Sequence, residues 1–321
     1  MRTALVTGIS GQDGSHLAEL LLGRGYRVVG TTRDAARELP AGLGERVELV
    51  AVDMLDGRRM AEVLSRHRPD EVYNLAACTS GEGQFDDAVE IGRVNGLAVS
   101  VLLEAIRGVD PRIRFCQASS SEMFGDASQS PQSEETPFHP RSFYGAAKLY
   151  AHWMVRAFRR RHGLFAASAI LFNHEGPRRG PGFVTRKVTS QVARIATGLA
   201  TELRLGNLDA RRDWGYAGDH VRGMWLMLQQ DSADDFVLAT GETHSVRELC
   251  ERAFGHVGLD YRDHVREDAA AFRPPDPVQL VGNPAKARAR LGWSAEVRFG
   301  ELVDMMVDAD LRLLRPGAGG A

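Results

Sequence analysis

The chain has 321 residues, of which 43% are hydrophobic and 26% charged, and its formal net charge is -2. This length suits about two domains, and the balanced, interspersed charges favour neither nucleic acid nor an anionic membrane as a partner. Three cysteines without C-x-x-C spacing argue against a disulfide framework, and no metal site is expected. We see no membrane-spanning apolar run and no signal peptide, so we expect a cytoplasmic protein.

Short apolar runs alternate with helix-length segments through the first half of the chain. Residues 3–7 are predicted to form a strand that leads into a glycine-rich turn and a helix. Further strands are predicted at residues 26–31, 47–52, 71–75, 113–118 and 167–172. This alternation predicts an α/β fold with a doubly wound parallel sheet covered on both faces. We therefore expect a Rossmann domain for NAD(P) binding over residues 1–172.

After residue 172 the pattern becomes irregular. Residues 173–183 are rich in glycine, proline and arginine and are expected to form a loop, followed by a helix over residues 184–197. Residues 211–220 are polar and are expected to be irregular. We predict a smaller, mainly substrate-binding domain over residues 173–321, with some segments returning to the sheet.

The first strand leads into the sequence Gly-Ile-Ser-Gly-Gln-Asp-Gly at residues 8–14. A turn with this glycine spacing lets the backbone approach a pyrophosphate, and the following helix adds N–H groups and a positive dipole. The pattern alone is weak, but its place between a strand and a helix favours a dinucleotide site. The predicted cofactor contacts in this turn are Gly8, Gly11, Gln12, Asp13 and Gly14.

Arg33 follows the second strand, where an acidic residue would bind the ribose 2′-hydroxyl of NAD. A cation at this position suits a 2′-phosphate, which favours NADP. The adjacent Asp34 weakens this argument and leaves NAD as the alternative. Asp53 and Met54, after the third strand, are expected near the adenine end of the cofactor.

Tyr144 and Lys148 are four residues apart, so they share one face of a predicted helix. A nearby ammonium favours the phenolate and is expected to lower the tyrosine pKa from about 10 towards the working pH. Tyr144 would then serve as an acid and base for a sugar hydroxyl. Such a spacing is common by chance, and it gains weight from the glycine-rich turn upstream.

Ser120 and Glu122 lie at the carboxyl end of a predicted central strand, where open parallel sheets bind their ligands. A tyrosine alone can support hydride transfer. Elimination of water also requires a group that moves a carbon-bound proton, and Glu122 is suited to that step.

The motifs together resemble the GDP-mannose 4,6-dehydratase family, within the extended short-chain dehydrogenases/reductases that modify nucleotide sugars. The segments that carry the resemblance are residues 7–15, 73–77, 117–122, 144–150, 170–175, 177–180, 183–187, 212–215 and 239–241. They extend over nearly the whole chain. The Gly-Gln-Asp-Gly turn and the Asn-His-Glu sequence at residues 173–175 are more specific than the superfamily motifs.

The resemblance implies roles for individual residues. Ser120 stands where the family has a catalytic threonine, and Glu122, Tyr144 and Lys148 match the other catalytic positions. Five more residues match cofactor contacts, namely Leu75, Ala76, Ala77, His174 and Arg179. The residues expected on the nucleotide-sugar side are Asn173, Glu175, Lys187, Asn207, Arg212 and Arg273.

The implied reaction is a 4,6-dehydration of GDP-mannose or a related GDP-sugar, with NADP as the bound cofactor. Tyr144 takes the C4 hydroxyl proton while hydride leaves C4. Glu122 then removes the C5 proton and helps expel water from C6, where the hydride returns. Lys148 tunes the tyrosine, and Ser120 hydrogen-bonds the reacting oxygen.

The chain departs from the family at residues 78–81, where Cys-Thr-Ser-Gly replaces Gln-Ser-His-Val, and at Glu90, where the family has a cofactor-facing tyrosine. Asp34 replaces an arginine in a loop that helps to build the family's tetramer, so we expect a homodimer. The altered residues 78–81 face the sugar. They keep open an epimerase or isomerase on the same scaffold, acting on a sugar as large as a heptose or octose.

Two further alternatives are a ketosugar reductase that consumes NADPH and a nucleotide sensor without catalysis. A reductase has no use for Glu122, and a sensor would have no reason to keep all four catalytic residues.

Overall fold

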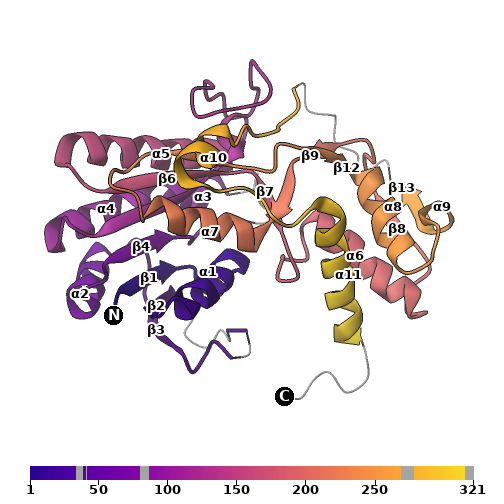
Figure 1. The fold of residues 1–321 in the computed structure, drawn as a ribbon, viewed down its shortest axis with the longest axis horizontal. Helices are drawn as coiled ribbons and strands as arrows, with labels where there is room; N and C mark the ends of the chain where they lie inside the picture. Colours follow the sequence, from indigo (N-terminus) through magenta and orange to yellow (C-terminus); the bar gives the residue numbers. More distant parts are fainter. Residues whose placement is uncertain (34–38, 41, 80–86, 269–277, 315–321) are drawn as a thin grey trace.

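The computed structural model describes residues 1–33, 39–40, 42–79, 87–268 and 278–314. Seven strands form one sheet in the order β11-β6-β5-β4-β1-β2-β3, and every adjacent pair is parallel (Figure 1). The strands are β1 (Thr3–Thr7), β2 (Arg27–Thr32), β3 (Val47–Ala51), β4 (Glu71–Asn74), β5 (Arg114–Ser120), β6 (Ala166–Leu171) and β11 (Phe236–Leu238). This sheet confirms the predicted doubly wound α/β fold.

Helices cover both faces of the sheet because successive strand residues point to opposite sides. Ala4 and Val6 of β1 pack in one core cluster, whereas Leu5 between them belongs to another. The first cluster lies under α1 (Gln12–Gly23) and α7 (Ala217–Met227). The second lies under α2 (Gly57–His67), α4 (Ala98–Val109) and α5 (Phe143–His162). The sheet is therefore buried on both faces, as parallel sheets require.

The order of the strands reverses beside β1. From β1 the chain winds outward through β2 and β3, then crosses to β4 on the other side and winds outward again. Loops that leave β1 and β4 consequently run in opposite directions. This reversal opens a crevice at the carboxyl ends of the two strands, where ligands bind in such sheets.

A smaller layer of helices lies beside the sheet (Figure 1). The helices α6 (Val184–Ala196), α8 (Val246–His256) and α11 (Phe299–Leu314) pack around a separate core cluster with β8 (Leu203–Leu205). The remaining described elements are α3 (Ala88–Gly92), η2 (Arg93–Leu97), η3 (Ser121–Met123), β7 (Asn173–Glu175), β9 (Arg211–Arg212), β10 (Trp214–Tyr216), β12 (His244–Ser245), α9 (Tyr261–His264), β13 (Val265–Glu267) and α10 (Ala285–Leu291). After residue 172, α7 and β11 return to the sheet, while the exact domain boundary stays a prediction.

Two segments differ from the sequence-based expectation. The predicted loop at residues 173–183 begins with strand β7, and the predicted irregular segment at residues 211–220 contains β9, β10 and the start of α7. Strands β7 and β10 pair in parallel, with Asn173 opposite Trp214. Their hydrogen bonds join segments that are distant in sequence, so neither segment shows a local strand pattern.

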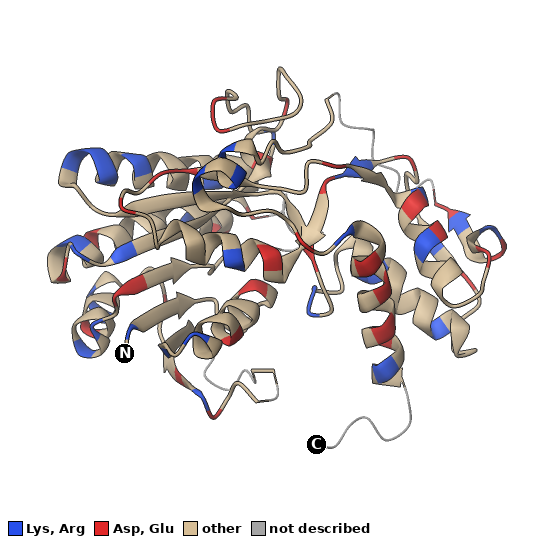
Figure 2. Cartoon of the chain, in the orientation of Figure 1, with Lys and Arg blue, Asp and Glu red and all other residues tan. Residues whose placement is uncertain are grey.

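Charged side chains of both signs are interspersed over the ribbon in Figure 2. Within the described ranges, we find no helix with the length and apolar character needed to cross a membrane.

The carboxylate of Asp235 fixes the edge of the sheet where β11 joins. It accepts two hydrogen bonds from the Arg159 guanidinium, at 2.9 and 2.8 Å, and one from the Ser168 amide at 3.1 Å. The Asp235 side chain is only 8% exposed. Burial alone would raise the Asp235 pKa, but the hydrogen bond and charge of Arg159 outweigh it and lower that pKa.

Replacing Asp235 should therefore be costly. Asp235→Ala leaves the Arg159 charge without its partner, and we expect the free energy of unfolding in urea to fall by about 3–5 kcal/mol. Glu104→Ala removes an exposed ion pair with Arg107 and should change stability by about 0–1 kcal/mol. Equal effects of the two variants would contradict a structural role for the buried pair.

Candidate active site

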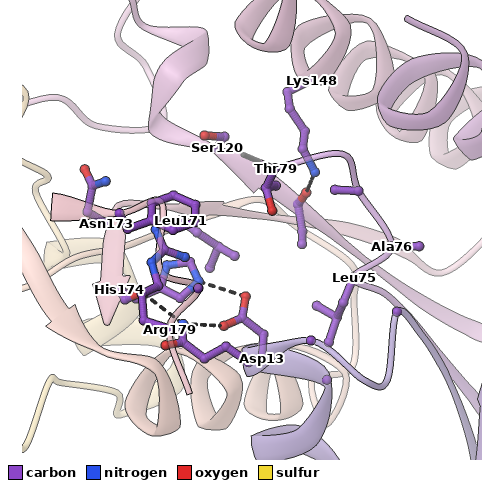
Figure 3. Close-up of a pocket in the computed structure, with 18 of the residues that line it drawn as sticks. Asp13, Leu75, Ala76, Thr79, Ser120, Lys148, Leu171, Asn173, His174 and Arg179 are labelled. Carbon is purple, nitrogen blue, oxygen red and sulfur yellow. Dashed lines mark hydrogen bonds and ion pairs between the residues drawn. The ribbon is translucent and has the colours of Figure 1, made fainter. Parts of the chain in front are cut away.

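A cavity of about 440 Å³ opens at the carboxyl ends of β1, β4, β5 and β6 (Figure 3). This volume is within the usual range for small-molecule sites. Of the residues predicted from the sequence, the cavity is lined by Gly8, Gly11, Gln12, Asp13, Gly14, Leu75, Ala76, Ala77, Ser120, Glu122, Tyr144, Lys148, Asn173, His174 and Arg179. Segments from distant parts of the chain thus contribute to one site.

The glycine-rich turn packs tightly against the strand beside it. Gly8 has a φ of +66°, and a Cβ on it would lie 2.8 Å from the Ala76 amide nitrogen. Any side chain at this position would close the cradle at the start of α1. The buried Gln12 Oε1 and Ser119 Oγ have no hydrogen-bond partner among the described residues. The cradle, the helix amino end and these spare polar atoms fit a dinucleotide pyrophosphate and its neighbouring groups.

Tyr144 and Lys148 are both buried on one face of α5, as their spacing predicted. The helix begins at the Ser142 cap, whose hydroxyl accepts a hydrogen bond from the Gly145 amide at 3.0 Å. A Cβ on Gly145 would lie only 2.5 Å from the Glu122 carbonyl oxygen. The missing side chain therefore lets the helix that carries Tyr144 touch the turn η3, which follows β5 and carries Glu122.

Burial dominates the electrostatics of the tyrosine and lysine. It raises the pKa of Tyr144 well above its usual value, although a hydrogen bond with Ser120 opposes the rise. Burial also lowers the pKa of Lys148 to about 8. The Lys148 ammonium donates to the Ala118 carbonyl at 2.8 Å and lies 5.6 Å from the centre of the Tyr144 ring.

The expected lowering of the Tyr144 pKa by Lys148 is therefore wrong for the described chain. The sequence places the lysine on the correct helix face, but it does not show how far a phenolate would be removed from water. Desolvation disfavours the charged form of each group, and it is the largest cause of both pKa shifts. The pair consequently favours the neutral tyrosine, the form that donates a proton.

An ion pair joins the glycine-rich turn to β7. His174 Nε2 lies 2.8 Å from Asp13 Oδ2, and His174 Nδ1 lies 2.7 Å from the Phe172 carbonyl oxygen (Figure 3). Burial would lower the pKa of His174, but Asp13 raises it overall, so both ring nitrogens can donate. Burial would likewise raise the pKa of Asp13, but His174 holds it well below its usual value.

Arg179 also lines the cavity, and Glu175 and Phe183 hold its guanidinium in place. Its Nε is 3.0 Å from Glu175 Oε2, and its guanidinium stacks 3.5 Å from the centre of the Phe183 ring. Glu175 also accepts a 2.5 Å hydrogen bond from Thr185. Glu175 was expected on the substrate side, but it is buried outside the cavity lining, where it positions Arg179.

Several predicted site residues lie away from this cavity. Arg33, Asp53 and Met54 are at the carboxyl ends of β2 and β3, on the side where the adenosine was expected. On the substrate side, Lys187, Asn207 and Arg212 lie on or near α6 and β9 and do not line the described cavity. Arg273 lies outside the described residues.

Several residues that line the cavity were not among the predicted site residues. One of them is Thr79, in the segment that was expected to face the sugar (Figure 3). Asn95, in the π-helical turn η2, accepts a hydrogen bond from the Cys78 amide at 2.8 Å and donates one to its carbonyl at 3.1 Å. Asn95 thereby fixes the backbone next to Thr79. The turn also contains Arg93, so a polar residue there gave no clear sequence signal for Asn95.

Acidic, histidine and cysteine side chains do not gather into a metal-binding group anywhere in the described ranges.

A parallel sheet with a glycine cradle beside a buried tyrosine–lysine pair defines an extended short-chain dehydrogenase/reductase. Comparison with known proteins agrees with this class. The structure of UDP-glucose 4-epimerase from Thermotoga maritima superimposes with a TM-score of 0.87 at 25% identity, covering 98% of this chain and 100% of that one. A putative epimerase from Burkholderia cenocepacia superimposes at 0.86 and 26% identity, covering 97% and 98%.

Sequence comparison is more specific. A family model described as GDP-mannose 4,6 dehydratase matches residues 5–306. GDP-mannose 4,6 dehydratase 1 from Arabidopsis thaliana is 46% identical, over 98% of this chain and 91% of its own length. The human GDP-mannose 4,6 dehydratase is 43% identical, over 97% and 92%. The chain therefore belongs to the GDP-mannose 4,6-dehydratase family, which confirms the resemblance drawn from its motifs.

The contact at Gly145 can be tested by adding one methyl group. Gly145→Ala should lower turnover about 10- to 100-fold, because the new Cβ pushes Tyr144 and Glu122 apart. Overpacking should also cost about 1–3 kcal/mol of stability.

Gly108→Ala is the matched control, since Gly108 lies in α4 and a Cβ on it would meet no atom within 4 Å. It should keep full turnover and gain up to about 1 kcal/mol from the better helix propensity of alanine. If both variants behave alike, the close contact is not what positions the two groups.

Proposed function

We propose that this protein is a nucleotide-sugar 4,6-dehydratase that acts on GDP-mannose or a related GDP-sugar with bound NADP, or alternatively NAD. The observation that carries this proposal is the meeting of Glu122 with Tyr144 and Ser120 in one cavity. A dehydratase needs one group for the hydroxyl proton and a second for the carbon-bound proton. The named activity of the full-length relatives supports the same reaction.

The roles of the residues follow from their positions. Tyr144 takes the proton of the C4 hydroxyl while C4 is oxidised, and Ser120 is placed to hydrogen-bond the same oxygen. Glu122 removes the C5 proton and delivers a proton to the departing C6 hydroxyl, which leaves as water. Lys148 holds the cofactor ribose and supplies positive charge near the tyrosine. A bound nicotinamide would supply the acceptor for the hydride from C4 and the donor of the hydride that reaches C6, while C5 takes up a proton.

The cofactor lies, in this proposal, along the carboxyl ends of the sheet strands. The turn at Gly8, Gly11 and Gly14 holds the pyrophosphate, and Arg33, Asp53 and Met54 face the adenosine. Arg179 and the Asp13–His174 pair position the nicotinamide side. The solved NADPH complex of RMD from Pseudomonas aeruginosa has the same fold, with a TM-score of 0.83.

The nucleotide diphosphate of the substrate lies, in this proposal, towards the smaller layer of helices. Asn173 lines the cavity at the start of β7 and would meet the sugar diphosphate. Lys187, Asn207 and Arg212 would meet the diphosphate and the base, with Arg273 from outside the described residues. The three cysteines are unpaired, which supports our placement of the protein in the cytoplasm.

Glu122→Gln separates dehydration from oxidation. The amide keeps the shape of the side chain but cannot accept the C5 proton, so formation of the dehydrated product should fall about 10²–10⁴-fold. Oxidation at C4 should survive, and reduced nicotinamide should accumulate. Both are measured in one assay, by nicotinamide absorbance and by the mass of the product.

Glu135→Gln, at an exposed position in the chain segment before α5, is the control and should leave turnover unchanged. In deuterated water the unmodified protein should place deuterium at C5 of the product. Full turnover of Glu122→Gln with an isomeric, deuterium-free product would instead select an epimerase and overturn the dehydratase proposal.

We also propose that two copies associate through the outer face of η2, α4 and α5. Three large apolar side chains are about half exposed there, Leu97 at 47%, Tyr150 at 45% and Trp153 at 51%. The Tyr150 hydroxyl is 3.1 Å from that of Ser100 on α4, which holds α4 and α5 in one surface. An exposed apolar face of this kind favours a self-complementary pairing about a two-fold axis.

Trp153→Glu should therefore convert the dimer to a monomer in sedimentation velocity, because a charge would be buried without a partner. Leu199→Glu introduces the same charge at an apolar side chain that is 55% exposed near the end of α6. It should leave the sedimentation coefficient unchanged. A Trp153→Glu dimer would exclude this face as the interface.

A further inference from the structure

An ion pair spans the side of the cradle where the adenosine ribose is proposed to lie. Arg33 Nη1, just after β2, is 3.4 Å from Glu90 Oε1 in α3. The two segments meet because β2 and β4 flank β1, so the chain after each strand returns to the same edge. Both side chains are accessible, 65% exposed for Arg33 and 38% for Glu90.

Acidic groups surround Arg33 at this edge. Asp87 caps α3, where its side chain accepts a hydrogen bond from the Glu90 amide at 2.9 Å. The nearby Cys78 thiol responds to the same charges. Burial raises the Cys78 pKa, the charge of Arg33 opposes the rise, and Glu90 and Asp87 add to it. Arg33 thus pairs with Glu90, and a second carboxylate, Asp87, lies at the start of the same helix.

This arrangement has opposite consequences for the two nicotinamide cofactors. A carboxylate beside the ribose can accept a hydrogen bond from the 2′-hydroxyl of NAD, whereas a cation there suits the 2′-phosphate of NADP. A phosphate ester carries about -1.5 to -2 charges near neutral pH, so Glu90 repels it. To bind that phosphate, Arg33 must also leave Glu90.

We propose that Glu90 is a specificity-determining residue, which competes with the 2′-phosphate for Arg33 and so lets the protein accept NAD as well as NADP. The inference rests on the proposed function, because it requires a dinucleotide in the glycine cradle.

The expected strengths of the two interactions decide whether Arg33 pairs with Glu90 or with the 2′-phosphate. An exposed ion pair contributes a factor of about one to five to an equilibrium constant. Charge-assisted hydrogen bonds from Arg33 to a phosphate contribute about 10- to 150-fold. The 2′-phosphate therefore displaces Glu90 from Arg33, but NADP binds more weakly than it would if Glu90 were absent. The competition therefore lowers the preference for NADP by up to about 5-fold.

The test measures the affinities of NAD and NADP directly, by isothermal titration calorimetry without any sugar substrate. Glu90→Gln keeps the size of the side chain but removes its charge, and it should tighten NADP binding about 3- to 10-fold. NAD binding should stay the same or weaken. The gain for NADP should shrink at high salt, because exposed charges are screened.

Two further variants test whether competition for Arg33 causes the change in NADP affinity. Glu104→Gln removes an exposed, ion-paired carboxylate on α4 and should change neither affinity. In an Arg33→Ala background, Glu90→Gln should improve NADP binding less than it does with Arg33 present, because the competition is gone.

Failure of the proposed function and failure of the inference about Glu90 give different binding results. If the unmodified protein binds neither dinucleotide, the proposed function fails and the inference with it. If it binds both but Glu90→Gln changes NAD and NADP equally, Glu90 affects only the shape of α3, and the inference alone is wrong. An undiminished gain for NADP in the Arg33→Ala background would show direct repulsion without competition for Arg33.

Discussion

The absence of a side chain at Gly145 is the constraint on which the site depends. Tyr144 and Lys148 belong to α5, whereas Ser120 ends β5 and Glu122 lies in the short turn η3 that follows it. The helix must touch this turn for the groups to share one substrate. A Cβ at Gly145 would lie 2.5 Å from the Glu122 carbonyl, well inside van der Waals contact. The helix reaches the turn only because this position has no side chain.

The parallel sheet makes that contact useful. Reversal of strand order beside β1 directs the chain after β1, β4, β5 and β6 to one edge. Segments that are distant in sequence therefore line one cavity. The short pair β7 and β10 carries Asn173 and His174 to the same edge from the part of the chain beyond the sixth strand.

Charges inside the site are paired or neutralised, as burial requires. Asp13 and His174 form an ion pair between the glycine cradle and β7, and Arg179 rests between Glu175 and Phe183. The buried tyrosine and lysine instead have pKa values displaced towards their neutral forms. Arg179 and the protonated His174 hold positive charge on one side of the cavity. The side of Tyr144, Ser120 and Glu122 is left free to move protons.

The sequence by itself determined the sheet, the glycine turn and the tyrosine–lysine face, because each depends on local periodicity or on a short spacing. It also determined the family, through motifs spread along the chain. Only the tertiary structure decided the strands at residues 173–175 and 214–216, whose hydrogen bonds come from each other. The same holds for the burial of Glu175 and the pairing of Arg33 with Glu90. It holds as well for the raised pKa of Tyr144, because desolvation depends on what packs around a group and not on its neighbours in sequence.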